Sequence, residues 1–289
     1  MIPILSIIFM CISAVVSVGL PVLLFITLRK KYSLKVAPML VGAAAFIVFA
    51  LGLEQLLHMI VLHPRPDGTI GLKSNLLLYI LYTCFAAGIF EETARFLSFS
   101  LLKKKYSGIG TGLSYGIGHG GFESAVLVGV SLVSSVVMCV MFNMGIANSP
   151  GLPAQAIEQL AAVKDMNPFL LLAGGFERIS ALVIQISLSL VVWHSVNRKD
   201  KWWLFPAAIL LHAAADVPAA LMQAGLLDSV LLVEGIVAAE AAALAAIAVF
   251  VCKKLKNNDE SIGGGSLQRR KFQIPLDNTQ PVAYNEFKQ

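Results

Sequence analysis

The chain has 289 residues, of which 57% are apolar and 13% are charged, and its mean hydropathy is +0.78. A soluble domain carries about twice that charged fraction, so the composition excludes an ordinary soluble protein. The net charge of +5 could suggest a nucleic-acid partner. Most Lys and Arg residues, however, lie in short clusters between long apolar runs, a pattern typical of membrane topology and not of phosphate binding.

Seven apolar runs are long enough to cross about 30 Å of hydrocarbon. They predict an all-α, multi-pass helix bundle. The first run has no basic residue before Arg29, so we interpret it as a retained span and not as a cleaved signal peptide. The fourth run is too long for one straight helix, and we expect it to tilt, to break among its glycines or to project beyond the membrane. The predicted spans are residues 3–28, 36–62, 74–102, 109–146, 167–195, 202–224 and 226–252.

Basic clusters fall in every second connection between these spans. By the positive-inside rule the N-terminus lies outside and the C-terminus in the cytoplasm, as an odd number of spans requires. We therefore expect a protein of the cell membrane that has the lipid bilayer as a partner and binds no nucleic acid. The four clusters begin at Arg29, Lys103, Arg198 and Lys253.

Two segments outside the spans, the C-terminal tail and one connection, have distinctive sequences. Residues 257–289 are polar and predict a flexible cytoplasmic tail after a transmembrane domain of residues 1–256, whose motif-bearing core is residues 74–224. Residues 148–167 contain an apolar face that predicts a short helix, either lying at the membrane interface or, as we favour, an ordinary loop helix.

The cysteines lie inside apolar runs and show no metal-ligand spacing. We interpret them as packing residues. They are Cys11, Cys84, Cys139 and Cys252.

Ionisable side chains inside the spans need an explanation, because each costs at least ~2.5 kcal/mol near the bilayer centre. Counting ~1.5 Å per residue places three i,i+4 pairs at one depth near the midplane. We expect these pairs to converge on one polar cavity, although each pair could instead neutralise itself and only stabilise the bundle. The pairs are Glu91 with Arg95, His119 with Glu123, and His212 with Asp216.

Other ionisable residues fall away from this level. Glu177 and Arg178 lie about 25 Å from the cytoplasmic side, so we interpret them first as a structural ion pair and only second as part of a substrate path. Glu54 and His58 lie close to the outer end of the second span and can reach the headgroups.

Several glycines lie close to His119 in the sequence of the fourth span. Gly112, Gly116 and Gly120 recur at four-residue spacing, which lets a neighbouring helix approach the backbone closely. Those that flank His119 could also leave room for a substrate backbone; they are Gly118, Gly120 and Gly121.

These motifs resemble those of the CAAX-protease and bacteriocin-processing (Abi) superfamily, which includes PrsW-like proteins. The glycine-framed second motif is most similar to the YhfC family of membrane peptidases. Asp216 stands where the CAAX-processing branch usually has Asn, as it does in PrsW-like proteins, which argues against prenyl-protein processing. The motifs are EETAR at 91–95, GHGGFES at 118–124 and HAAAD at 212–216, each on its own span.

The resemblance implies an intramembrane endopeptidase that hydrolyses a membrane-associated protein or peptide with water activated by Glu91 or Glu92. Adjacent carboxylates in a low dielectric repel each other, so one of the two should be poised as a base. The carboxylate that is paired less closely with Arg95 should be the base, and we favour Glu91 for this role. His119 and His212 could donate hydrogen bonds to the developing oxyanion. Supporting positions fall to Arg95, Glu123 and Asp216.

Three alternatives stay open. We favour no cofactor, yet His119, Glu123 and His212 could supply zinc with two nitrogens and one oxygen; the paired-His helix of H-E-x-x-H is absent. A proton-coupled transporter would also carry midplane carboxylates, but the chain has no convincing internal repeat and seven spans do not divide into two inverted halves. A non-catalytic scaffold or immunity protein is the third possibility.

Overall fold

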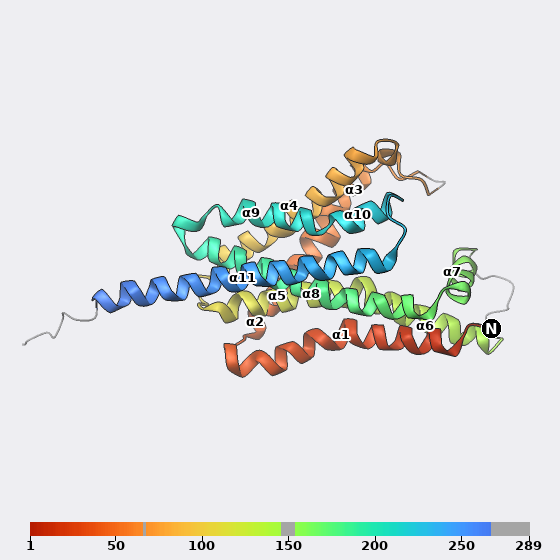
Figure 1. The fold of residues 1–289 in the computed structure, drawn as a ribbon, viewed down its shortest axis with the longest axis horizontal. Helices are drawn as coiled ribbons and strands as arrows, with labels where there is room; N and C mark the ends of the chain where they lie inside the picture. Colours follow the sequence, from red (N-terminus) through yellow and green to blue (C-terminus); the bar gives the residue numbers. More distant parts are fainter. Residues whose placement is uncertain (66–67, 146–153, 267–289) are drawn as a thin grey trace, which may run out of the picture. The chain divides into compact units, whose positions relative to one another are not determined.

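The computed structural model describes residues 1–65, 68–145 and 154–266, and these residues form helices without a β-strand (Figure 1). Seven helical segments are long and apolar enough to cross a membrane, which confirms the predicted multi-pass helix bundle. These segments are Ile4–Tyr32, Val36–Val61, Leu76–Leu102, Ile109–Asn143, Pro168–Asn197, Lys199–Gln223 and Val230–Lys253.

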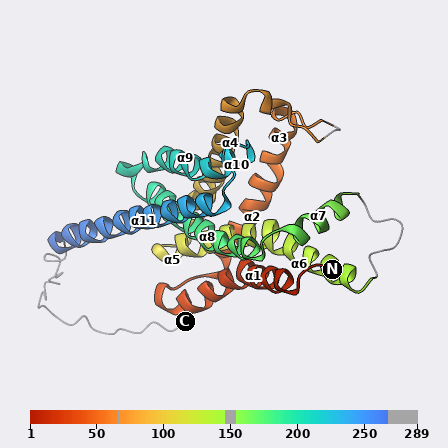
Figure 2. The ribbon, with the colours of Figure 1, turned by 45° about the vertical axis from the view of Figure 1, so that its right-hand side comes forward.

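Several spans consist of more than one helical element. Elements α4 and α9 pack side by side, as do α1 and α6, and α5 contacts α1, α2 and α8 (Figure 2). In chain order the elements are α1 (Ile4–Tyr32), α2 (Val36–Ala45), η1 (Phe46–Glu54), α3 (Gln55–Val61), η2 (Gly71–Ser74), α4 (Leu76–Leu102), α5 (Ile109–Glu123), η3 (Ser124–Gly129), α6 (Val130–Asn143), α7 (Ala154–Asp165), α8 (Pro168–Asn197), η5 (Lys199–Lys201), α9 (Leu204–Ala215), α10 (Val217–Gln223) and α11 (Val230–Ser266).

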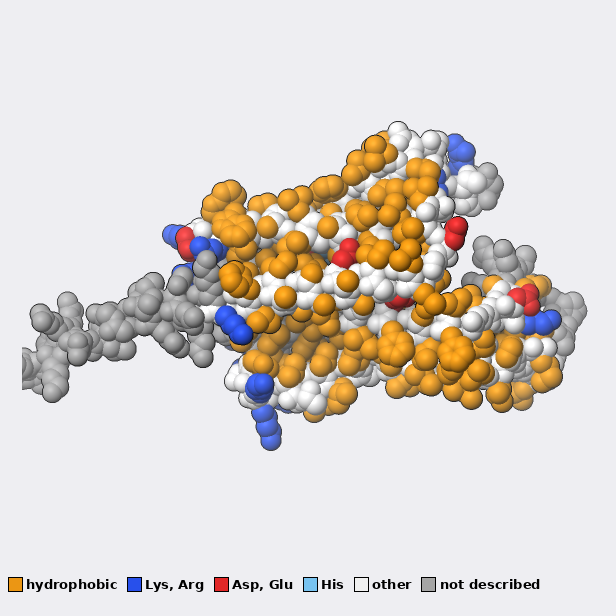
Figure 3. Space-filling view, in the orientation of Figure 1, with side chains coloured by type: hydrophobic (Ala, Val, Ile, Leu, Met, Phe, Trp, Pro, Cys, Tyr) orange, Lys and Arg blue, Asp and Glu red, His pale blue; other side chains and the backbone are white. Residues whose placement is uncertain are grey.

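The outer surface of the bundle is apolar. Figure 3 shows hydrophobic side chains over most of one face of the molecule. On α1, for example, Val15, Val22 and Ile26 are each more than half exposed. A soluble monomer rarely exposes apolar surface this continuously, whereas a helix bundle in lipid does so along its whole hydrocarbon-facing surface.

Two spans contain a wide-turned π-helical segment. Segment η1 ends at Glu54 in the second span, and η3 begins directly after Glu123 in the fourth. The long fourth span is therefore interrupted after its glycine-rich stretch and not among the glycines themselves. Such wide turns are rare and occur frequently at functional sites.

Glycines of α5 let three neighbouring helices approach its backbone. A Cβ added at Gly118 would overlap the carbonyl oxygen of Met39 on α2, and one at Gly121 would lie 2.6 Å from the Cβ of Pro21 on α1. At Gly120 the added atom would lie 2.7 Å from the Cβ of Gln185 on α8. The expectation that these glycines leave room for a substrate is therefore wrong, because protein fills the space.

The predicted loop helix corresponds to α7. Its residue Leu160 is buried in a cluster with Ile2 and Cys139, which favours a helix docked on its own protein. Cys84 is also buried, as expected of a packing residue, whereas Cys11 is exposed on α1 and does not fit that interpretation. Residues 148–153 of this connection lie outside the described part of the chain.

The chain divides into two units, Met1–Cys252 and Lys253–Gln289. Helix α11 extends to Ser266, so residues 257–266 of the predicted tail are helical and not irregular. Residues 267–289 lie outside the described part of the chain.

We predict that Gly118→Ala destabilises the protein by about 2 kcal/mol or more, because the added methyl must displace the α2 backbone. Gly174→Ala on α8 is the matched control, since a Cβ there meets nothing within 4 Å. Chemical unfolding in detergent measures both. Equal stabilities of the two variants would contradict this account of the α2–α5 contact.

Candidate active site

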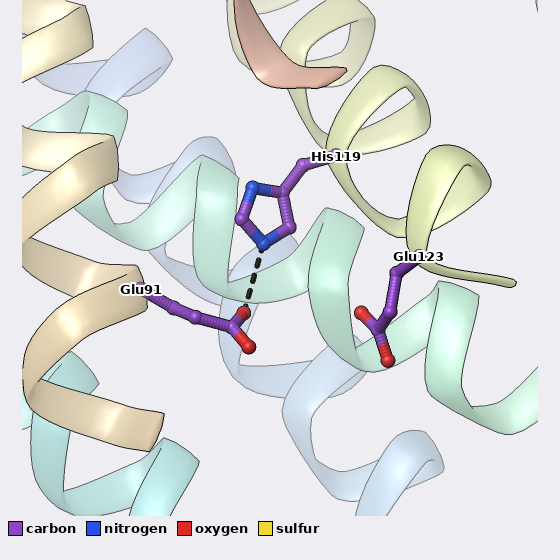
Figure 4. Close-up of side chains that lie close together, drawn as sticks. All are labelled: Glu91, His119 and Glu123. Atoms are coloured by element: carbon purple, nitrogen blue, oxygen red, sulfur yellow. Dashed lines mark hydrogen bonds and ion pairs between the residues drawn. The ribbon is translucent and has the colours of Figure 1, made fainter. Parts of the chain in front are cut away.

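The three sequence motifs meet inside the bundle. Helix α4 supplies Glu91, α5 supplies His119 and Glu123, and α9 supplies His212. Figure 4 shows Glu91 facing His119 and Glu123 across the gap between α4 and α5. The predicted convergence on one site is present, and the closest contacts do not lie within the i,i+4 pairs.

Glu92 forms the most deeply buried part of the site. Both Glu92 and Arg95 are 0% exposed, and the Arg95 guanidinium donates to Glu92 Oε1. On the far side, His212 Nδ1 lies 2.6 Å from the same oxygen. Charge-assisted bonds of this kind are the strongest that side chains make. Glu92 Oε1 therefore has two close partners, whereas Glu92 Oε2 is enclosed by protein and has no hydrogen-bond partner in the described structure.

Glu91 keeps one oxygen open. Its Oε2 lies 2.8 Å from His119 Nε2, 3.1 Å from Gln185 Nε2 and 3.4 Å from Arg95 Nη2. Within the described part of the chain, no hydrogen bond reaches its Oε1. Glu91 also pairs less closely with Arg95 than Glu92 does. Glu91 thus combines a fixed side chain with a free acceptor.

Two aromatic rings orient His119. The Phe46 ring meets its imidazole edge-on with centroids 5.3 Å apart, and the Tyr115 ring stacks on it at 5.8 Å. His119 is fully buried, and its Nδ1 has no hydrogen-bond partner in the described structure. The rings leave Nε2 as the reactive nitrogen, directed at Glu91.

His212 has one nitrogen that is only loosely engaged. Its Nε2 lies 3.7 Å from Asp216 Oδ2 and 3.9 Å from Glu91 Oε2, both beyond normal hydrogen-bond length. The Asp216 side chain is 37% exposed, more than the other carboxylates of the site. When both ring nitrogens are protonated, Nδ1 donates to Glu92 and the N–H at Nε2 is available to an incoming acceptor.

Helix α8 adds residues that the motifs did not predict to belong to the site. Gln185 donates to Glu123 at 2.6 Å as well as to Glu91, and Arg178 Nη1 lies 3.7 Å from Glu123 Oε1. Arg178 bonds to Glu177, as predicted. It also contacts Glu123, although its predicted depth in the membrane placed it away from the site. Gln185 follows Arg178 by seven residues, two turns along one helix face, which is the signal that would have identified it.

The sequence analysis placed one further carboxylate wrongly and did not name two others. Glu54 is only 6% exposed, bonds with His58 at 3.3 Å and lies within electrostatic reach of Glu91, so it does not extend to the headgroups as expected. Glu234 and Glu240 lie within the seventh span, where the sequence reading named no charge. Their position inside a long apolar run was the available signal.

One group of the site fits a divalent cation. One ligand atom each of Glu91, His119 and Glu123 lies within 4.8 Å of the others, whereas the predicted set contained His212 in place of Glu91. Imidazole nitrogen and carboxylate oxygen are accepted zinc ligands. His119 Nε2 and Glu91 Oε2 lie 2.8 Å apart, and a proton shared between them would have to leave for both atoms to bind a cation.

The charge of the site also favours a cation. Four carboxylates pair with two guanidinium groups in the described part of the chain, and an excess of negative charge inside an apolar bundle is costly. The carboxylates are those of Glu91, Glu92, Glu123 and Glu177, and the guanidinium groups are those of Arg95 and Arg178.

A family model described as YhfC intramembrane metalloprotease matches residues 16–237, which contain all three motifs. The chain belongs to the YhfC family. The uncharacterized membrane protein YhfC of Bacillus subtilis (strain 168) is 34% identical over 266 residues, covering 87% of this chain and 96% of that protein. No solved structure matches the chain.

Membership of the YhfC family confirms the predicted resemblance and the prediction of a multi-pass intramembrane protease. The family description names a metalloprotease, whereas the sequence analysis favoured no cofactor and gave zinc as the alternative. The group of Glu91, His119 and Glu123 is where such a metal fits.

We predict that Arg95→Gln destabilises the protein by ~3–5 kcal/mol, because it leaves Glu92 buried without its guanidinium partner. Adding Glu92→Gln should recover a large part of this loss. Arg198→Gln, on an exposed pair with Asp200, should change stability by less than ~1 kcal/mol. The free energy of unfolding in detergent measures this cycle, and strictly additive effects of the two buried substitutions would contradict the coupling.

Proposed function

We propose that this YhfC protein cleaves peptide bonds of membrane-associated proteins or peptides at a centre formed by Glu91, His119 and Glu123. The observation that carries the proposal is the state of Glu91, whose Oε2 is held by three donors while its Oε1 is free. A carboxylate held in this way is suited to take a proton from water at one defined oxygen.

The proposal includes a divalent cation, with zinc as the first candidate. Glu91, His119 and Glu123 would each contribute one ligand atom. When bound, such an ion supplies Lewis-acid polarisation of the peptide carbonyl. The buried surplus of carboxylates supports this part of the proposal, as does the description of the family.

The remaining residues orient the reacting groups. As an imidazolium, His212 can donate from Nε2, which has no close partner, to the carbonyl oxygen as negative charge develops on it. Glu92 accepts from His212 Nδ1 and so fixes the ring orientation that presents Nε2. Arg95 donates to both carboxylates of the pair and holds them in place. His119, predicted as an oxyanion donor, is instead assigned to Glu91 and the cation.

The first test compares the two adjacent carboxylates. Glu91→Gln keeps shape but removes the free acceptor, so cleavage should fall by ~10²–10⁴. Glu92→Gln should keep measurable turnover, since Glu92 is already occupied by Arg95 and His212. The readout is the set of membrane-protein fragments in cells that express each variant. The reverse order, with Glu91→Gln active and Glu92→Gln inactive, would move the base to Glu92.

A second test concerns the cation. Phenanthroline should abolish cleavage by the purified protein in liposomes, and added zinc should restore it. Bound metal, measured by elemental analysis, should be lost in Glu123→Gln and retained in Ser187→Ala, a buried change on α8 that touches none of the three ligands. Full cleavage in the presence of chelator, with no metal bound, would leave Glu91 acting without a cation and refute this part of the proposal.

A further inference from the structure

Gln185 is a buried neutral side chain that contacts three charged residues of the site. It lies on α8 and is 5% exposed. Its Nε2 lies 3.1 Å from Glu91 Oε2 and 2.6 Å from Glu123 Oε2, and its Oε1 accepts from the Arg95 guanidinium. Gln185 is neither a base nor a cation ligand in the proposed reaction.

The contact with Arg95 fixes which way the amide faces. A guanidinium group only donates hydrogen bonds, so the atom of Gln185 beside it must be the carbonyl oxygen. The amide nitrogen then points to the carboxylates, and its two N–H groups suffice for one bond to each. Gln185 therefore bridges Glu91 and Glu123, which come from different helices.

We propose that Gln185 is a positioning residue that holds Oε2 of Glu91 and Oε2 of Glu123 and thereby keeps Oε1 of Glu91 directed at the substrate. This inference rests on the proposed peptidase function. Each carboxylate has rotatable bonds and could exchange its two oxygens. A donor shared by both removes that freedom and sets the spacing of the two ligands before substrate binds.

Gly120 supplies an independent observation. An added Cβ at this position would lie 2.7 Å from the Cβ and 3.0 Å from the Cγ of Gln185. A side chain at position 120 would therefore push α8 away from α5 at Gln185. Gly120 directly follows His119, so the close approach of the two helices lies beside the site.

The test uses Gln185→Met, which keeps length and removes both donor and acceptor, and Gln185→Glu, which keeps shape and replaces the donors with acceptors. Ser187→Ala is the matched control: it is equally buried on α8, and its hydroxyl bonds only to the carbonyl of Val183. The substrate is a transmembrane peptide that the wild type cleaves. Zn²⁺ alone is titrated against a competing indicator.

We expect kcat to fall ~10–100-fold in both Gln185 variants while KM stays within about twofold, and Zn²⁺ affinity to fall by a similar factor. The unfolding midpoint of Gln185→Met should fall because Arg95 loses an acceptor, whereas Gln185→Glu keeps an acceptor for Arg95. Gly120→Ala should reproduce the loss of kcat by displacing Gln185. If one Gln185 variant does not accumulate in membranes, the other gives the same comparison.

Two results would overturn the inference while leaving the peptidase intact. The first is wild-type kcat and Zn²⁺ affinity in a Gln185 variant. The second is a loss of kcat that Ser187→Ala shares, which would make the effect one of α8 packing. A wild-type protein that cleaves no peptide and binds no Zn²⁺ would instead refute the proposed function, and the role of Gln185 with it.

Discussion

The fold depends on one electrostatic constraint, the placement of a guanidinium group among carboxylates in the middle of an apolar bundle. Arg95 is fully buried and bonds with Glu92, Glu91 and Gln185. An uncompensated charge there would cost several kcal/mol, so every group that Arg95 touches has to stay in place. The residue thereby links α4 to α8, and through Glu92 to His212 on α9. Three helices of the site thus meet at this one side chain and its partners.

Close backbone approach is the second requirement of such a site. Side chains as short as Glu and His can meet across helices only when the helix axes lie close together, and α5 achieves this with glycine where it faces α1, α2 and α8. These glycines leave α5 without side chains of its own at the positions that face the three helices. His119 depends on Phe46 and Tyr115 for its orientation, one of them supplied by another helix.

Much of this arrangement could be predicted from the sequence. Apolar run lengths gave the spans, and the i,i+4 motifs gave three of the four helices that form the site. Gln185 was not predicted because the sequence analysis considered only ionisable residues inside the spans, and Gln185 carries no charge. Glu54 and Arg178 were misplaced because depth was counted as if spans were straight and upright, whereas η1 ends at Glu54. Which partner His119 takes, Glu91 or Glu123, depends on interhelical distance, and no residue spacing encodes it.

The distribution of counter-charges along the chain also bears on how the protein is made. Spans enter the bilayer in order as they leave the ribosome, N-terminal first. Helix α4 contains Arg95 and the two carboxylates that it pairs with, so most of its charge is compensated within the helix. Helix α5 contains Glu123 but no Lys or Arg. That carboxylate stays uncompensated until α8 delivers Arg178 some fifty residues later. The fourth span therefore precedes, in the order of synthesis, the guanidinium group that contacts its carboxylate in the finished bundle.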